Sequence, residues 1–500
     1  MSSATPQPTP HRAALADLLS LQNHDLQSQG APGLSPVLEN IQRLREGANA
    51  VVTGQQVTLF GGPLFTLLKA ATAIRRAKDA SDAGHPHVPI FWLATEDHDL
   101  AEADSVALPA GDELRRLKLL VERRHGGPVG RIPLGEDVTR VLCEAASLLD
   151  PGPFFDELEA CYRPGATFGN AFGSLLARVF SRYGLIVLDA NSRDFHALGR
   201  EVLRAAILRA EELHAALHDR DAQLSARNYH SQVLVPAQSS LLFLIEETGA
   251  RVPLRRNAAN RWQAGRNAYS TDDLLGILDR EPERLSPNAL LRPVFQDFIL
   301  PSTAYVGGPS EIAYFAQSEV LYQKLLGRTT PILPRLSATL IEPAVASVMA
   351  RHDLSLPDVI QAAMRDPQEL AHRLGARALP IEAKRKLAAT GNALEAELQA
   401  LTGYLHSLSA DLGRSSEVAA SKMRYQMNRL RRLAANDQLR REQSLAHHAL
   451  AVMLSLFPER HPQERIVGAA FFLSRYGDSL LETIVDHAGQ LCPGHKAIWL

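Results

Sequence analysis

Apolar positions along the chain change between continuous runs and a helical spacing. AVVT at residues 50–53 and VPIFWLAT at 88–95 are continuous runs, which are typical of buried strands in a parallel sheet. Between them, an amphipathic helix is predicted to begin near Pro63, with its apolar face formed by Leu64, Leu67, Leu68, Ala71 and Ile74. This spacing leaves Lys69 on the surface. The three segments together predict a right-handed β–α–β unit.

Further strand-like runs alternate with helical stretches such as 194–226, and this alternation predicts an α/β fold. These runs are YGLIVLDA at 183–190, HSQVLVP at 230–236, SLLFLIEE at 240–247 and TTPILPRLSATLIEP at 329–343. The region around 226–290 differs because it combines short strands with polar turns. We interpret it as an inserted β-rich subdomain.

After residue 380 the pattern becomes a heptad repeat. Its leucines form an a/d seam, which predicts an antiparallel coiled-coil hairpin with a turn at LGRSSEV and a second helix from about 416 to 456. The seam consists of Leu387, Leu394, Leu401 and Leu408, with Leu398, Leu405 and Leu412 four residues after the last three. The predicted domains are an N-terminal helical segment (1–48), a core (49–378), the hairpin (379–457) and a C-terminal segment packing back on the core (458–500).

Composition and charge narrow the class of protein. Hydrophobic residues make up 45% of the chain and charged residues 22%, which is typical of a globular protein. The formal net charge is −2, so no chain-wide electrostatic field favours binding to nucleic acid or membranes. The chain has no apolar signal core and no run of ~18 apolar residues, which predicts a cytoplasmic protein without a membrane segment. Its three cysteines, Cys143, Cys161 and Cys492, contain no C-x-x-C pair, so we predict neither a disulfide framework nor a metal site.

The sequence TGQQ, from Thr53 to Gln56, follows the first predicted strand. A glycine turn at Gly54 would leave backbone N–H groups and a helix N-terminus available to phosphate or carboxylate, with Gln55 adding amide donors. The stretch contains neither a Walker A pattern nor G-x-G-x-x-G. Two interpretations stay open: an anion or nucleotide site, or a tight turn that needs glycine only for its geometry.

Four consecutive ionisable residues, Glu96, Asp97, His98 and Asp99, follow the second predicted strand. Ligands of open α/β sheets bind at the carboxyl ends of strands, and this cluster is expected at such an end. It would supply a general base, a magnesium ligand or an amine clamp. The alternative interpretation is an exposed acidic loop.

Two later segments repeat this arrangement. In PSTAYVGGPSEIAYF, Gly307 and Gly308 precede a helix that begins with Glu311 in its first turn, where the carboxylate would either cap the helix or contribute to a site. In PILPRLSATLIEP, Arg335 and Ser337 adjoin a strand, and the arginine would form a buried ion pair or clamp a carboxylate or phosphate.

A basic run in the hairpin, SKMRYQMNRLRRL, predicts either a solvated helix face or an RNA-binding patch.

Five blocks of the chain resemble, in order, the bacillithiol biosynthesis cysteine-adding (BshC) family. They are VVTGQQ…GGPLFTLLKA, VPIFWLATEDHDLAE, LLRPVFQDFILPSTAYVGGPSEIAYF, ILPRLSATLIEP and LFPERHPQERIVGAAFFL. The resemblance implies a Rossmann-like core with connecting insertions, a coiled-coil hairpin and a homodimer. It also implies a ligase that adds cysteine to glucosaminyl-malate through an amide, in the last step of bacillithiol synthesis.

This role assigns chemistry to the candidate residues. If ATP or another nucleotide activates the carboxylate of cysteine, Thr53–Gln56 would bind it, while Asp97, His98 or Asp99 would deprotonate the amine. Arg335 or Gly307–Gly308 would hold the malate carboxylates. The H-x-G-H and K-M-S-K-S motifs of class I synthetases are absent, so the sequence leaves the cofactor open. The alternatives are a nucleotidylyltransferase-like or RNA-binding relative of those synthetases, and a non-catalytic, nucleotide-binding dimeric scaffold.

Overall fold

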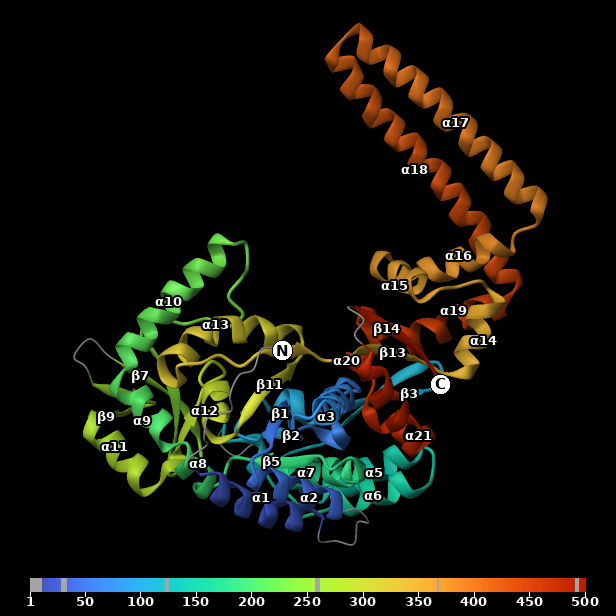
Figure 1. The fold of residues 1–500 in the computed structure, drawn as a ribbon. Helices are drawn as coiled ribbons and strands as arrows, with labels where there is room; N and C mark the ends of the chain where they lie inside the picture. The colour runs from blue at the N-terminus through green and yellow to red at the C-terminus, as the bar shows by residue number, and fades with distance from the viewer. Residues whose placement is uncertain (1–10, 28–33, 122–125, 257–260, 367, 491–493) are drawn as a thin grey trace. The chain divides into compact units, whose positions relative to one another are not determined.

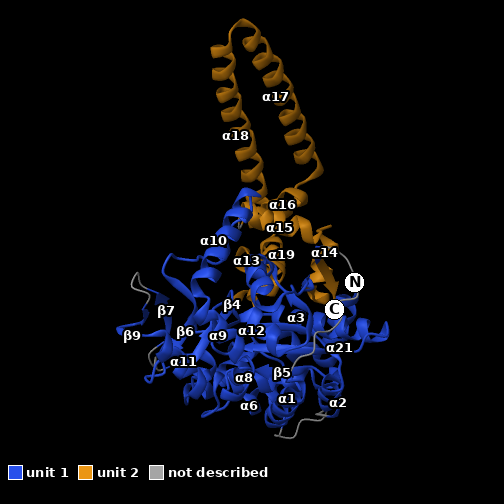
Figure 2. Cartoon of the chain, turned by 60° about the vertical axis from the view of Figure 1, so that its left-hand side comes forward, with its two compact units in different colours: residues 1–108, 115–338, 467–495 blue, residues 109–114, 339–466, 496–500 orange. Residues whose placement is uncertain are grey.

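The computed structural model describes residues 11–27, 34–121, 126–256, 261–366, 368–490 and 494–500. The chain forms two units, coloured separately in Figure 2. Unit 1 consists of residues 1–108, 115–338 and 467–495, and unit 2 of residues 109–114, 339–466 and 496–500.

The centre of unit 1 is a five-stranded parallel sheet (Figure 1). Its strands, in spatial order, are β12 (Ile332–Pro334), β11 (Ser302–Gly307), β1 (Asn49–Gln56), β2 (His87–Ala94) and β5 (Ile186–Asp189). From β1 the chain proceeds to β2 and β5 on one side and returns later to β11 and β12 on the other. The strand order therefore reverses between β1 and β11, which is where open α/β sheets bind ligands. The predicted α/β fold with a Rossmann-like parallel sheet is confirmed.

Alternate residues of β1 face two different helical layers. Ala50 and Val52 belong to the large apolar core that includes α1 (Arg12–Gln27) and α2 (Leu34–Arg45). Val51 packs in the opposite layer with small residues of α3 (Phe65–Asp82). Burial on both faces explains why the strand is an almost continuous apolar run.

Helix α1 also covers the free edge of the sheet. The Asn23 amide donates to the Val187 carbonyl (2.9 Å) and accepts from the Val187 N–H (3.0 Å). Gln22 makes the same two-way contact with Asp189, at 2.9 and 3.0 Å. These two amides satisfy the exposed backbone of β5, so this edge cannot pair with another strand.

The predicted turn at TGQQ is wrong, because β1 continues through Gln56 and pairs with β2 up to Ala94. Gly54 is required by the sheet instead: a Cβ there would lie 2.7 Å from the Trp92 carbonyl oxygen. The sharp turn comes later, where Phe60, Gly61 and Gly62 have φ of 52°, 82° and 70°.

Two other predicted strands differ from the structure. Residues 230–236 form no strand, because the Gln317 side chain binds both the N–H and the carbonyl of Val233, each at 2.9 Å. The run at 329–343 is divided into β12 and β13 (Ser337–Ile341), with Arg335 in the gap.

The predicted β-rich insertion contains an antiparallel sheet and α11 (Thr271–Arg280). Its strands are β10 (Leu285–Pro287), β6 (Ser239–Ile245), β7 (Arg251–Arg256), β8 (Trp262–Ala264) and β9 (Asn267–Tyr269). The other helices of unit 1 used below are α4 (Leu100–Ala103), α6 (Pro153–Cys161), α7 (Phe168–Val179), α8 (Arg193–Leu198), α10 (Ala210–Ala226), α12 (Arg292–Ile299), α13 (Pro309–Leu326) and α21 (Ala469–Gly489). Helix α21 packs against α3.

Unit 2 contains the predicted hairpin, formed by α17 (Ile381–Leu408) and α18 (Ala410–Arg441). Its turn is at Ser409, whose hydroxyl accepts from the Leu412 N–H (3.1 Å), and not at LGRSSEV. Gly413 lies inside α18, where a Cβ would lie 2.1 Å from Nδ1 of His406. The glycine that suggested a turn therefore permits close packing of the two helices.

The hairpin is continued by α19 (Gln443–Leu456), which packs with α14 (Pro343–Arg351), α15 (Leu356–Arg365) and α16 (Glu369–Ala378). Seam residue Leu398 is buried, whereas Leu401, Leu408 and Leu412 are 54%, 55% and 48% exposed. Thus only part of the predicted seam is buried within one chain. Among the described residues, no helix is both long and apolar enough to cross a membrane.

Replacing Gly54 by alanine should destabilise unit 1 by about 1–3 kcal/mol, because the added methyl group collides with the backbone of β2. The measurement is denaturant unfolding followed by fluorescence. Gly135→Ala is the matched control: a Cβ there meets nothing within 4 Å, and we expect a change within about 0.5 kcal/mol. Equal stability of the two variants would contradict the assigned strand pairing.

Candidate functional site

Lys69 on α3 is buried at the carboxyl end of β1, where it is 3% exposed. Its Nζ donates to the Gly54 carbonyl (2.8 Å) and to Oε1 of Gln55 (2.9 Å). The same ammonium group pairs with Glu311 at 2.5 Å. Burial, the largest effect, lowers the pKa of Lys69, with Glu311 opposing it and the nearby Arg335 and Arg292 lowering it further.

The surface position expected for Lys69 is therefore wrong. The lysine lies four residues before Ala73, which packs on β1 and β11 together with Ala77 four residues later. Residues four apart lie on the same face of a helix, so Lys69 shares the sheet-facing side of α3 with Ala73 and Ala77. Its burial is compensated by a carboxylate far along the chain, which a local pattern does not reveal.

Glu311, in the first turn of α13, holds the other side of the cluster. Its carboxylate accepts from the Gly308 N–H (2.8 Å) and from the Tyr305 hydroxyl (2.7 Å) in addition to pairing with Lys69. Burial alone would raise the pKa of Glu311, but Lys69 and these hydrogen bonds outweigh it and lower the pKa. The interpretation of Glu311 as a helix cap is confirmed, and its contribution to a binding site stays a prediction.

Two arginines lie beside this ion pair. Arg292, at the start of α12, donates to the Tyr314 hydroxyl (2.6 Å) and acts electrostatically on both Lys69 and Glu311. Arg335 is 8% exposed, donates to the Leu336 carbonyl (2.8 Å) and lies 5.4 Å from the Phe65 ring centre. Lys69 and Arg292 thus share the single carboxylate of Glu311, so these three side chains together carry one net positive charge. Such a cluster favours carboxylates or phosphates as ligands.

Glu96, the first residue of the acidic stretch, is fully engaged. It accepts from Nε2 of His196 (2.7 Å) and from the Ser286 hydroxyl (3.0 Å), which in turn accepts from Arg251 (3.1 Å). Burial would raise the pKa of Glu96, but His196, Arg251 and Ser286 outweigh it and lower the pKa. Glu96 therefore ties the end of β2 to α8 and to the β-rich insertion.

The next three residues present their side chains near the surface. The Asp97 carboxylate accepts from the His98 N–H (2.7 Å), and Asp99 caps α4 through the Ala101 N–H (3.1 Å). The side chains of Asp97 and His98 are 43% and 51% exposed. Nδ1 of His98 lies 3.3 Å from Nη1 of Arg251. This leaves an accessible imidazole beside a carboxylate at the sheet edge.

The TGQQ and EDHD segments are joined directly. The Gln56 side chain donates to the Asp99 carbonyl (3.0 Å), across the carboxyl ends of β1 and β2. The structure therefore brings two of the predicted segments to one edge of the sheet, and Gly308, Glu311 and Arg335 to the same edge at β11. We refer to Lys69, Arg292, Glu311, Arg335 and the segment 96–99 as the sheet-edge site, because they lie at the carboxyl ends of β1, β2 and β11.

Some predicted residues have structural contacts instead. The Thr53 hydroxyl donates to the Val306 carbonyl (2.9 Å) within the sheet. A Cβ at Gly307 would lie 3.2 Å from Cβ of Glu311, so this glycine admits the helix to the strand. Ser337 contacts Nδ1 of His495 at 2.8 Å. Any further role of these residues in binding stays a prediction.

Sequence reasoning missed Lys69, Arg292, His196, Arg251 and Ser286. LLRPVF carried a signal for Arg292, a cation directly before a proline that begins a helix, whereas Arg251 and Ser286 come from the insertion and have no local signature. Among the described residues, no group of three His, Cys, Asp or Glu side chains is arranged to hold a metal ion.

Comparisons with known proteins also divide the chain after β12, but they place residues 467–495, which are part of unit 1, in the second domain. Residues 1–336 match the family model "Bacillithiol biosynthesis BshC, N-terminal Rossmann-like domain", and residues 338–500 match "Bacillithiol biosynthesis BshC, C-terminal coiled-coil domain". A protein of Koribacter versatilis named "Putative cysteine ligase BshC" is 43% identical over 468 residues, covering 93% of this chain and 87% of the relative. A Solibacter usitatus protein of the same name is 36% identical, covering 97% and 89%.

Among solved structures, a Campylobacter jejuni protein titled as an arginyl-tRNA synthetase overlaps 93% of this chain and 98% of its own, at 9% identity. Its TM-score of 0.23 is too low to support any conclusion.

Removing one partner of the Lys69–Glu311 pair should destabilise the protein by about 3–5 kcal/mol, because the other charge stays buried and unpaired. We expect Lys69→Met and Glu311→Gln each to show this loss in denaturant unfolding. The double variant should lose clearly less than the sum of the two. Strict additivity would show that the pair does not couple α3 to α13.

Proposed function

This chain belongs to the bacillithiol biosynthesis BshC family, and from that premise we propose that it joins cysteine to glucosaminyl-malate through an amide, in the last step of bacillithiol synthesis. It is a ligase that forms a carbon–nitrogen bond. The observation that carries the substrate assignment is the sharing of the Glu311 carboxylate by two buried cations, Lys69 and Arg292, with Arg335 beside them. This cluster suits a substrate that carries two carboxylates at one end.

The reaction forms a bond between the carboxyl carbon of cysteine and the glucosamine nitrogen. One carboxyl oxygen must leave, and the attacking amine must lose a proton. A nucleoside triphosphate would supply the leaving group by transferring a phosphoryl or nucleotidyl group to that oxygen. The guanidinium groups of the sheet-edge site would bind the phosphate or the carboxylates, as arginines do in other proteins. The Lys69 ammonium group, whose three protons are used by Gly54, Gln55 and Glu311, would contribute its charge. Gln55 and Gln56 would add amide contacts to the bound substrate.

We assign the proton transfer to His98 with Asp97 beside it. Their partial exposure permits contact with a substrate amine, whereas Glu96 is occupied by His196 and Ser286. Asp99 is used as a helix cap, so its contribution is to hold the segment in place. Glu96 acts as a positioning residue for the same segment.

We also propose that the protein works as a homodimer on these small-molecule substrates. The exposed seam residues Leu401, Leu408 and Leu412 support this state, since a second copy would remove them from water. The RNA-binding alternative has weaker support from the hairpin, because Arg424 is paired with Glu395 through two hydrogen bonds of 2.8 and 2.9 Å. A cytoplasmic location stays a prediction.

The test is thiol profiling by mass spectrometry in a bacillithiol-producing host that lacks its own family gene. The wild-type chain should restore bacillithiol and remove accumulated glucosaminyl-malate. The Asp97→Asn, His98→Asn double variant should leave bacillithiol at least about tenfold lower, since general base catalysis contributes roughly 10²–10⁴-fold to rate.

His85→Asn makes the same chemical change at an exposed histidine before β2 and should restore bacillithiol fully. If the wild-type chain fails to restore the thiol, the ligase assignment is wrong. If the double variant restores it as well as wild type, the assignment of the base to Asp97 and His98 is wrong while the ligase assignment stands.

A further inference from the structure

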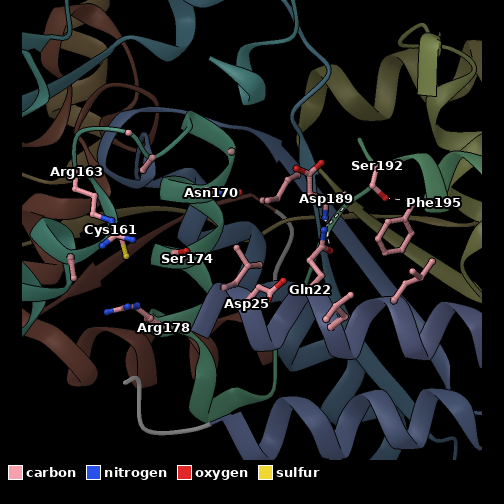
Figure 3. A pocket seen from close by; sticks show the side chains of 18 of the residues that line it. Gln22, Asp25, Cys161, Arg163, Asn170, Ser174, Arg178, Asp189, Ser192 and Phe195 are labelled. Atoms are coloured by element: carbon pink, nitrogen blue, oxygen red, sulfur yellow. Dashed lines mark hydrogen bonds between the residues drawn. The ribbon is translucent and has the colours of Figure 1, made fainter. Parts of the chain in front are cut away.

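A cavity in unit 1 is lined by residues other than those of the sheet-edge site. It has a volume of about 740 Å³ and is bordered by α1, α7, the loop after α6 and the segment after β5 (Figure 3). Small-molecule sites in proteins typically have volumes of roughly 300–1,000 Å³. None of Glu96, Lys69, Glu311 or Arg335 lines it. The proposed ligase chemistry therefore leaves this cavity without a role.

One end of the cavity is cationic. Arg163 is exposed, and within the described part of the chain its side chain makes no ion pair or hydrogen bond. Arg178 is 6% exposed and pairs with Glu157, but its Nε is buried without a hydrogen-bond partner among the described residues. Figure 3 shows both arginines on the same side of the cavity as Cys161. Through the exposed Arg163, this end can therefore accept an anionic group.

Cys161 does not make this a nucleophilic site. Burial, the largest effect, raises the pKa of its thiol to about 12, so the sulfur stays protonated and neutral near pH 7. It forms an uncharged wall between the two guanidinium groups. A binding role fits the chemistry of this end better than a covalent one.

The other end is acidic and polar. Figure 3 shows Asp189 and Ser192 on the side opposite Arg163 and Arg178. Asp25 lies between these two sides, near Gln22. Asp194 follows Ser192 in the first turn of α8 and is exposed. Leu18, Leu93 and Phe195 add apolar wall to the cavity, and Figure 3 shows Phe195 beside Ser192. The cavity thus has positive side chains at one end and negative side chains at the other.

We propose that this cavity binds a zwitterionic small molecule of about dipeptide size. Its carboxylate lies toward Arg163, and its ammonium group lies toward Asp194. A polyphosphate would be repelled at the acidic end, and a polyamine at the cationic end. A molecule with opposite charges at its two ends meets a favourable partner at each. This proposal does not depend on the reaction at the sheet-edge site.

The test uses alanyl-leucine with the full-length protein, in isothermal titration calorimetry. Two analogues serve as matched probes: N-acetyl-alanyl-leucine, which lacks the ammonium group, and alanyl-leucine amide, which lacks the carboxylate. We expect the zwitterion to bind at least about tenfold more tightly than either analogue, as one lost charged hydrogen bond predicts.

Two exposed substitutions assign each charge to its end of the cavity. Arg163→Glu should weaken the dipeptide and its acetylated form at least about tenfold, and leave the amide unaffected or tighter. Asp194→Asn should weaken the dipeptide and the amide but not the acetylated form. Arg227→Glu, an equal charge reversal after α10, should change nothing.

Absence of saturable dipeptide binding would overturn the proposal, as would equal binding of all three ligands. Dipeptide binding that Arg163→Glu leaves unchanged would place the ligand elsewhere and would also overturn it. None of these results bears on bacillithiol synthesis, which is tested separately.

Discussion

The buried ion pair between Lys69 and Glu311 is the interaction on which the sheet-edge site depends. Through Lys69 it fixes α3 to the end of β1, and through Glu311 it fixes the start of α13 to Tyr305 at β11. It therefore crosses the point where the strand order reverses. A charge buried without its partner is strongly destabilising, so the two halves of the sheet are constrained to meet in one arrangement. Arg292 is added to this frame, so that two cations share the carboxylate of Glu311, and Arg335 lies beside them.

The two functions that we propose for the site, carboxylate binding and proton transfer, belong to residues at the ends of neighbouring strands. The cations surround the ends of β1 and β11, whereas the accessible Asp97 and His98 follow β2. The hydrogen bond from Gln56 to the Asp99 carbonyl connects them, and the Glu96–His196 contact anchors the second segment from behind. We propose that a substrate with carboxylates at one end and an amine at the other contacts both groups. Proximity of this kind lowers the entropic cost of bringing the reacting groups together.

Much of this arrangement was accessible from the sequence, because continuous apolar runs identified β1 and β2 and the strand rule located the EDHD segment at a sheet edge. Lys69 was missed because a lysine on an amphipathic helix normally faces water, and only a partner far along the chain permits its burial. Arg251 and Ser286 were missed for the same reason, since the insertion carries them to β2. The glycines of TGQQ and LGRSSEV suggested turns, yet each one admits a close neighbour: a strand at Gly54 and a helix at Gly413.

The most direct measurement is a crystal structure of the protein with glucosaminyl-malate bound. We predict that the malate carboxylates lie within hydrogen-bond distance of Arg292 or Arg335, with the glucosamine nitrogen directed toward His98. Substrate bound away from the carboxyl ends of β1, β2 and β11, for instance in the cavity beside α1 and α7, would contradict it.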